Sequence, residues 1–505
     1  MTVGFQEAVT ETQPEGRGRA DSARTNRSLA LGLGGYSAFA AFCLISLFAF
    51  YSMVFVPHHN VAGPVLSARL AQELGASFSD YSSYFPPAEE AWFGLALRLS
   101  DLLSIKPDMM VVLMTGAAVL LSSGLAYRIR RQTVGATPLW SALSVVALIV
   151  LPILFKNLLG VRVHLVVLGL WPYLNLRLCD PDDTRIGWKL RAVVGLFLGA
   201  TLTLRYIFCI IVLAVELADA AIARRVWSLF RIENLIAGAI VALYLFSWLI
   251  IDPSQREVMG AMVSAIDANL ISVKGNIAFA AIYGSTAIFF VAVSYVFKLP
   301  ARTTAIGLAM VLGGLVAAWI QSRWYTHHVF PIVAAYVAWL WMIHRDVKPL
   351  WLAALALIVA QPFVKEFAAI APYQQSVDEL EQALDRAEIS VAGKRVGLLN
   401  MHPSPFNQYL AAHGAIRWNG SINNAYVAAE LKDFDQPENA DLRVPPVSLS
   451  DPGRAMLHDE MLRLWEDMPP DVLILDESKS WPLRHVTVRW TDAFARDTRF
   501  QAILR

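Results

Sequence analysis

The chain has 505 residues, with 42 Lys and Arg against 41 Asp and Glu, so its formal net charge is only +1. This balance excludes a bulk electrostatic attraction to nucleic acid. Hydrophobic residues make up 56% and charged residues 16%, with a mean hydropathy of +0.48. Such values exclude a disordered chain and an ordinary soluble domain of this length, and they indicate a protein embedded in a membrane.

The chain begins with a polar, Gly- and Arg-rich tail over residues 1–28, which we expect to be disordered and cytoplasmic. A helix that crosses the hydrocarbon layer needs about 20 apolar residues. About eleven runs approach this criterion and predict a mainly α, polytopic membrane domain over residues 29–371. The runs lie near 29–55, 109–127, 138–155, 158–176, 190–206, 207–222, 232–251, 277–297, 304–321, 328–343 and 350–370.

The stretch 192–222 is either one long helix or a hairpin of two short helices that turns near Arg205. Basic residues favour the cytoplasmic side of a membrane. A single helix would force Arg224, Arg225 and Arg231 to the outer side, so we choose the hairpin. On the same stretch, Glu216 and Asp219 are expected to pair with Arg224 or Arg225.

This orientation places a long loop, residues 56–108, on the outer side. Two amphipathic stretches within it, 62–74 and 88–104, are predicted to lie along the membrane surface, separated by Pro86 and Pro87. A loop of this length usually carries function or helices of its own.

Residues 372–505 are richer in charge and are predicted to form a small α/β domain on the outer side. Strand patterns occur in KRVGLLN and DVLILDES, and helical patterns in QQSVDELEQALDRAEI and RAMLHDEMLRLWEDM. Strands that alternate with helices are typical of an α/β unit.

Asp80 stands out in the outer loop because Tyr81 and Tyr84 flank it in DYSSYFPP. A carboxylate beside aromatic rings at the membrane boundary suits a general base that acts on a sugar hydroxyl. The alternative is a loop aspartate that stabilises a turn or caps a helix. Glu89 and Glu90 are interpreted as charges at a helix start.

His58, His59 and Asn60 follow the first span directly. Adjacent histidines can bind a metal or an anion, but hydrogen bonding at the membrane interface is the plainer interpretation. The three cysteines have no metal-ligand spacing, so a divalent metal is allowed by the sequence but not implied.

Four basic residues on the outer side run against the positive-inside bias: Lys156, Arg162, Arg205 and Arg323. An ionisable group at membrane depth costs about 2.5–3.5 kcal/mol, which a bound anion would offset. A lipid phosphate fits because a guanidinium binds phosphate oxygens in a bidentate fork. The alternative for each residue alone is snorkelling to lipid headgroups.

Two short motifs resemble those of the GT-C superfamily, integral membrane glycosyltransferases that use polyprenyl-phosphate sugars. The superfamily's D…Y…PP stretch is similar to Asp80, Tyr84, Pro86 and Pro87. Its KGWxYHxxP motif is loosely similar to RWYTHHVFP. There Arg323 takes the Lys position, Tyr325 the Trp, His327 the Tyr, His328 the His and Pro331 the Pro.

The resemblance implies transfer of a sugar from a polyprenyl-phosphate donor to an envelope glycan, lipid or protein, with inversion, at the outer face of a bacterial inner membrane. Asn60 departs from the acidic residue that some relatives carry there, so the base is Asp80, His58 or His59. The donor phosphate would bind Arg205, Lys156, Arg162 and Arg323. Substrate would contact Tyr81, Tyr84, Asn60, Tyr206, Trp324, Tyr325, His327 and His328.

Two other functions stay open from the sequence. A transporter or lipid flippase predicts ionisable groups near mid-membrane and paired repeats with broken helices. A non-catalytic scaffold predicts that the C-terminal region binds a partner, and Asn60 in place of a carboxylate favours this.

Overall fold

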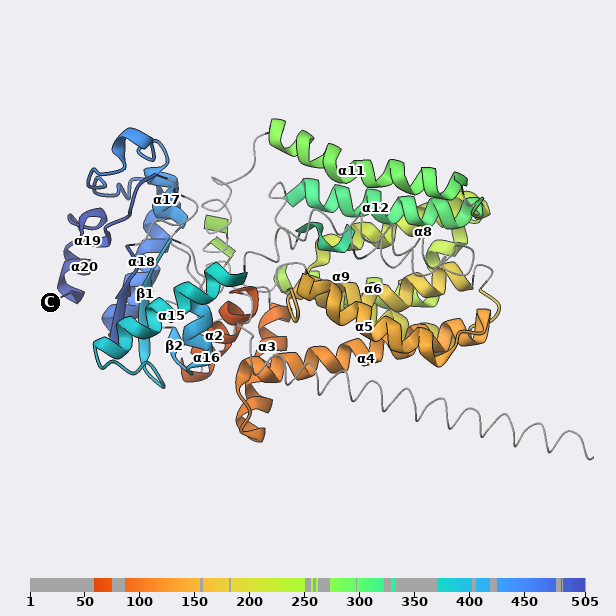
Figure 1. Ribbon diagram of the computed structural model, residues 1–505, viewed down its shortest axis with the longest axis horizontal. Coiled ribbons are helices and arrows are strands. Elements are labelled where there is room, and N and C mark those ends of the chain that lie inside the picture. Colours follow the sequence, from red (N-terminus) through yellow and green to blue (C-terminus); the bar gives the residue numbers. More distant parts are fainter. Residues whose placement is uncertain are drawn as a thin grey trace, which may run out of the picture.

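The structure is a computed structural model and is mostly helical (Figure 1). It describes residues 59–74, 87–154, 158–180, 183–249, 256–257, 260–261, 273–296, 298–321, 328–332, 334, 370–401, 406–417, 425–477, 483 and 485–504. The expected span at 29–55 lies outside these residues, and so does the expected span at 350–370 apart from Ile370.

The central part of the chain forms a helical bundle that runs along the long axis in Figure 1. Three of its described stretches are long and apolar enough to cross a membrane: Pro107–Val134, Tyr206–Ala223 and Ala301–Gln321. This supports the prediction of a membrane protein. The bundle helices are α4 (Pro107–Val134), α5 (Pro138–Leu154), α6 (Arg162–Cys179), α7 (Trp188–Thr203), α8 (Cys209–Ala223), α9 (Ile232–Leu249), α11 (Val273–Val296) and α12 (Ala301–Gln321).

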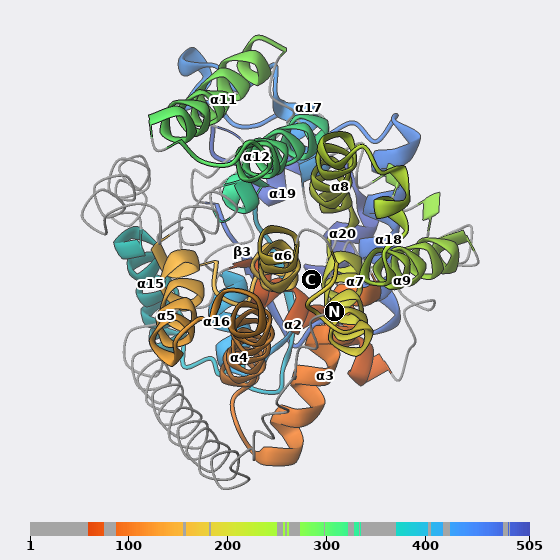
Figure 2. The same cartoon turned by 90° about the vertical axis from the view of Figure 1, so that its right-hand side faces the viewer.

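The predicted hairpin within 192–222 is confirmed. Helix α7 ends at Thr203, and Arg205, with φ −157°, breaks the helix before the short 3₁₀ helix η1 (Tyr206–Phe208) and α8. Asp183, just before α7, pairs with Arg231, which also pairs with Glu216 near the end of α8. The start of α7 and the end of α8 therefore lie at the same end of the bundle, and Figure 2 shows the two helices separately in end-on view.

Small residues bring the bundle helices into close contact. A Cβ atom added at Gly195 of α7 would lie 2.6 Å from the backbone oxygen of Glu233 in α9, and one at Gly313 of α12 would lie 2.8 Å from Cα of Ile211 in α8. Helices in lipid associate through such backbone packing, because burial of apolar surface gives little net gain there.

Two helices come from the long loop, α2 (His59–Leu74) and α3 (Pro87–Leu103), and they lie between the bundle and the C-terminal elements (Figure 1). Helix α2 is more deeply buried in the protein than the amphipathic pattern of 62–74 predicts, since Val61, Val65 and Leu70 are at most 2% exposed, and its position along the membrane surface stays a prediction. The reason is that α2 carries apolar and small residues around most of its circumference, so it is buried on several sides.

The C-terminal elements surround a three-stranded parallel sheet of order β2-β1-β3. Strands β1 (Arg395–Leu399) and β3 (Val472–Leu475) occur where the sequence predicts them, and β2 (Ile416–Arg417) is an addition. Central strand β1 is apolar because it is buried on both faces. The helices here are α15 (Ile370–Arg386), α16 (Phe406–Ala412), α17 (Ala425–Leu431), η3 (Pro437–Asn439), α18 (Pro452–Asp467), α19 (Trp490–Ala493) and α20 (Thr498–Ile503).

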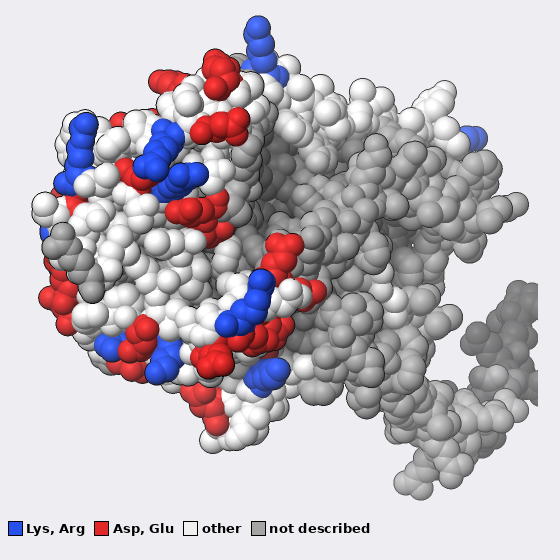
Figure 3. Space-filling model, turned by 60° about the vertical axis from the view of Figure 1, so that its left-hand side comes forward, with Lys and Arg blue, Asp and Glu red and all other residues white. Residues whose placement is uncertain are grey.

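One continuous apolar core extends from the bundle through α2 to α16 and β1. Arg69 of α2 donates a hydrogen bond of 3.0 Å to the backbone oxygen of Gly414, beside β2. Figure 3 shows that the outer face of the C-terminal elements carries acidic and basic side chains interspersed, as in proteins exposed to water. That 372–505 is a separate domain stays a prediction.

The contact at Gly195 predicts a matched pair of variants. Gly195→Ala should lower the thermal unfolding temperature in detergent, because the new methyl group must displace the α9 backbone. Gly238→Ala, on α9 with no neighbour within 4 Å of the added atom, should leave the temperature unchanged or raise it slightly through helix propensity. Equal responses of the two variants would contradict this packing.

Candidate functional site

A buried carboxylate and two arginines converge at one end of the bundle, which we call the Glu89 end. Glu89 lies in the first turn of α3 and is fully buried. Arg162, the first residue of α6, places Nη1 2.6 Å from Glu89 Oε2. Arg205 donates a hydrogen bond to the side-chain oxygen of Gln321, the last residue of α12. Burial raises the pKa of Glu89, and the charges of Arg162 and Arg205 oppose that rise.

The backbone before α6 explains how Arg162 reaches this place. Gly160 has φ +75°, and a Cβ atom there would lie 3.1 Å from the Val111 side chain and 3.9 Å from that of Val61. The left-handed conformation and this tight space both favour glycine. Val61 follows Asn60 at the start of α2, so Asn60 lies at the same end of the bundle as Arg162.

Glu90, the neighbour of Glu89, is also largely removed from water. Burial raises its pKa to about 7. Among the described residues, neither of its carboxylate oxygens has a hydrogen-bond partner, and the same holds for Glu89 Oε1 and Arg162 Nε. The Glu89 end thus offers buried acceptors and a buried donor that can bind a polar or charged group.

The structure brings together several residues that the sequence predicts for a site. Arg162 pairs with Glu89, Arg205 lies near enough for its charge to act on the same carboxyl, and Asn60 lies at the same end. Tyr206, 47% exposed, follows Arg205. His328 is buried, and the ring of Phe330, two residues later, lies 6.4 Å from that of His164, two residues after Arg162.

Other predicted residues are not tested by the structure. The side chain of His59 lies outside the part described, although its backbone begins α2. The following lie wholly outside the described residues: His58, Asp80, Tyr81, Tyr84, Lys156, Arg323, Trp324, Tyr325 and His327.

The interpretation of Glu89 and Glu90 as plain helix-start charges is incomplete. Both occupy the first turn of α3, but Glu89 shares the buried face of that helix with Phe93 and Leu97. The intervals of four residues place these side chains on one stripe of a helix. That spacing was the signal in the sequence that could have identified Glu89 as a buried, functional candidate.

A second polar cluster lies at the opposite end of the bundle, which we call the Arg177 end. Arg177 of α6 is fully buried and forms ion pairs with Glu233 of α9 and, at 3.5 Å, with Glu216 of α8. Arg191 of α7 pairs with Glu233 at 3.1 Å and with Asp180 at 2.5 Å. These contacts join the ends of four helices.

The predicted pairing of Glu216 and Asp219 with Arg224 or Arg225 is wrong. Glu216 pairs with Arg177 and Arg231, and Asp219 pairs with Arg231 at 2.8 Å and with Arg302 at 2.5 Å. The physical reason is the left-handed conformation of Arg224 (φ 52°), which ends α8 and turns the chain so that Arg231 reaches back to the helix.

No group of three His, Cys, Asp or Glu side chains suited to a metal ion occurs within the described ranges. Comparison of the chain with protein-family models, with curated proteins and with solved structures finds no match. The case for function therefore comes from the residues themselves.

The pKa of Glu90 predicts a pH-dependent stability. Between pH 4.5 and about 7 the folded state holds a proton that the unfolded state releases, so the free energy of unfolding falls as pH rises through this window, by about 3 kcal/mol in total. Glu90→Gln removes the titration. The unfolding temperature of the wild type, measured in detergent from pH 5 to 8, should drop relative to that of Glu90→Gln. Parallel curves would contradict the raised pKa.

Proposed function

We propose that the chain is an integral membrane glycosyltransferase. It transfers a sugar from a polyprenyl-phosphate donor to a hydroxyl of an envelope glycan, lipid or protein. The observation that carries the proposal is the convergence of Arg162, Arg205 and Glu89 at one end of a helical bundle. Cations beside a buried carboxylate are the pair of charges that departure of a phosphate and removal of a proton require.

The arginines would act on the leaving group. When the bond between the anomeric carbon and the lipid phosphate breaks, the electron pair stays with the phosphate oxygen and negative charge develops there. Arg205 and Arg162 can stabilise that charge through N–H donors aimed at the phosphate. Because the two guanidinium groups already lie at this end, they need little reorganisation when the charge appears. The proposal requires no cofactor.

A carboxylate would act on the acceptor. The acceptor oxygen attacks the anomeric carbon from the face opposite the phosphate, which inverts the configuration, and its proton passes to the base. Asp80 remains a candidate base from the sequence, with His58 and His59 as alternatives. Glu90 is a further candidate, because a base with a pKa of about 7 is well matched to proton transfer near neutral pH.

The charges at the two ends support an orientation in the membrane. Arg131 in the last turn of α4, Lys189 at the start of α7 and Arg225 all lie toward the Arg177 end. The positive-inside bias assigns such an end to the cytoplasm, and hence the Glu89 end and the C-terminal elements to the outer side. We retain about eleven spans and the inner membrane of a bacterium as parts of the proposal.

The placement of charge also favours a transferase over a transporter or flippase. Along α6, Arg162 and Arg177 are 15 positions apart, about 22 Å at 1.5 Å per residue, and the described ion pairs of the bundle gather at these two ends. A transporter would place its ionisable groups near the middle of the membrane. A scaffold protein would not need buried carboxyl groups whose pKa is raised, such as those of Glu89 and Glu90.

The roles of the carboxylates predict the effect of two amides. Asp80→Asn or Glu90→Gln, whichever removes the base, should lower sugar transfer in membranes about 100-fold or more at unchanged protein level, because an amide cannot take the acceptor proton. Transfer of radiolabelled sugar from a lipid-linked donor pool to membrane glycans measures this. Full activity in both variants would remove both carboxylates from the mechanism.

The role of Arg205 predicts weaker donor binding. Arg205→Ala should reduce the affinity for a polyprenyl-phosphate analogue about tenfold or more, since a hydrogen bond to a charged group contributes about 1.5–3 kcal/mol. Arg205→Lys, which keeps the charge, should retain part of that affinity, and Arg128→Ala, an exposed site on α4, should retain all of it. If Arg205→Ala folds normally, by its unfolding temperature, and binds the analogue as the wild type does, the phosphate role is wrong.

A further inference from the structure

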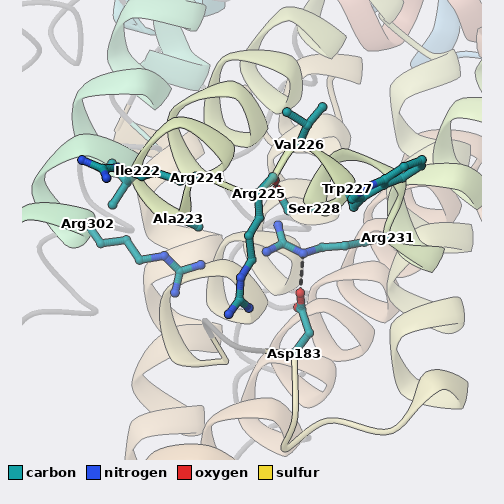
Figure 4. Close-up of a pocket in the computed structure, with 10 residues that line it drawn as sticks. All are labelled: Asp183, Ile222, Ala223, Arg224, Arg225, Val226, Trp227, Ser228, Arg231 and Arg302. Atoms are coloured by element: carbon teal, nitrogen blue, oxygen red, sulfur yellow. Dashed lines mark hydrogen bonds and ion pairs between the residues drawn. The ribbon is translucent and has the colours of Figure 1, made fainter.

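A cavity of about 750 Å³ opens at the Arg177 end, far from the proposed active site. Four arginines and one carboxylate are among the residues that line it (Figure 4). Its volume falls within the range of about 300–1,000 Å³ that is usual for small-molecule sites. The charged lining residues are Asp183, Arg224, Arg225, Arg231 and Arg302.

The positive charge of this cavity is only partly balanced. Arg231 pairs with Asp183 at 2.6 Å, and Arg302 pairs with Asp219. The side chains of Arg224 and Arg225 are exposed and, within the part of the chain that the structure describes, have no ion pair or hydrogen bond. Figure 4 shows the guanidinium groups of Arg225, Arg231 and Arg302 facing the same space.

The rim of the cavity is apolar and exposed. Val226 and Trp227 of the short 3₁₀ helix η2 (Val226–Phe230) line it and are 68% and 83% exposed, and Phe230 at the end of η2 is 56% exposed. Exposed tryptophan beside arginine at the end of a membrane helix is typical of the headgroup region. The arrangement suits an amphiphile whose charged group enters the cavity while its chains lie against η2.

We propose that this cavity binds the phosphate of an anionic ligand, held by the guanidinium groups of Arg225 and Arg302. Two sources share that chemistry, an anionic phospholipid and a free phosphate, and the exposed apolar rim favours the phospholipid. Basic pockets between membrane helices on the cytoplasmic side bind anionic headgroups in this way. The site is independent of sugar transfer, since it lies at the other end of the bundle.

The test uses the full chain in detergent. The protein is titrated with phosphatidylglycerol and, separately, with phosphatidylcholine of the same acyl chains, and the bound lipid is measured by native mass spectrometry. The wild type should bind phosphatidylglycerol more tightly than phosphatidylcholine. Arg225→Ala should weaken the binding of phosphatidylglycerol about fivefold, which is the effect of losing one basic contact. Arg225→Lys should restore most of it. Arg131→Ala, an exposed arginine at the same end of the bundle but outside the cavity, should change nothing.

A second arm separates the two sources. Inorganic phosphate is added to lipid-depleted protein, and the unfolding temperature is measured for the wild type and for Arg225→Ala. No shift, together with the lipid preference above, assigns the site to a phospholipid headgroup. A shift in the wild type that is lost in Arg225→Ala assigns it to a free phosphate. If Arg225→Ala folds normally, and if its lipid binding and its response to inorganic phosphate both equal those of the wild type, the cavity does not bind phosphate and the proposal is overturned.

Discussion

The ion pairs of Arg177 are the constraint on which the bundle depends. A fully buried guanidinium costs several kcal/mol of desolvation, and removal of one partner from a buried pair typically costs about 3–5 kcal/mol. The carboxylates of Glu216 in α8 and Glu233 in α9 supply the negative charge that offsets the cost of burying Arg177. Asp219 then holds Arg302 of α12. These ion pairs fix which ends of these helices lie together and how the helices are aligned along the axis of the bundle.

That register at one end positions the other end. An α-helix rises by a constant distance of about 1.5 Å per residue, so helices that are aligned at one end of the bundle have defined positions at the other end. The starts of α6 and α8 and the end of α12 therefore lie together at the far end of the bundle. Arg162, Arg205 and Gln321 occupy those three positions. The glycines at the α7–α9 and α8–α12 contacts keep the backbones close along the way. The register set at the Arg177 end thus adds to the local contacts of Arg162 with Glu89 and of Arg205 with Gln321.

Charge and apolar runs were enough to predict a helical membrane bundle and the break in it at Arg205. The hairpin at Arg205 follows from the positions of Arg224, Arg225 and Arg231, because basic residues collect on one side of a membrane. Partners of individual charges could not be predicted, since they depend on which helices pack together: Asp219 meets Arg302, 83 residues away in sequence. Glu89 was missed because its charge was weighed without the apolar stripe that it shares with Phe93.

The burial of α2 connects the C-terminal elements to the candidate site. Its first residues pack beside Gly160, two positions before Arg162, while Arg69 and Leu70 contact the C-terminal elements. The C-terminal elements and the segment that leads into Arg162 therefore contact the same helix, α2, at its two ends.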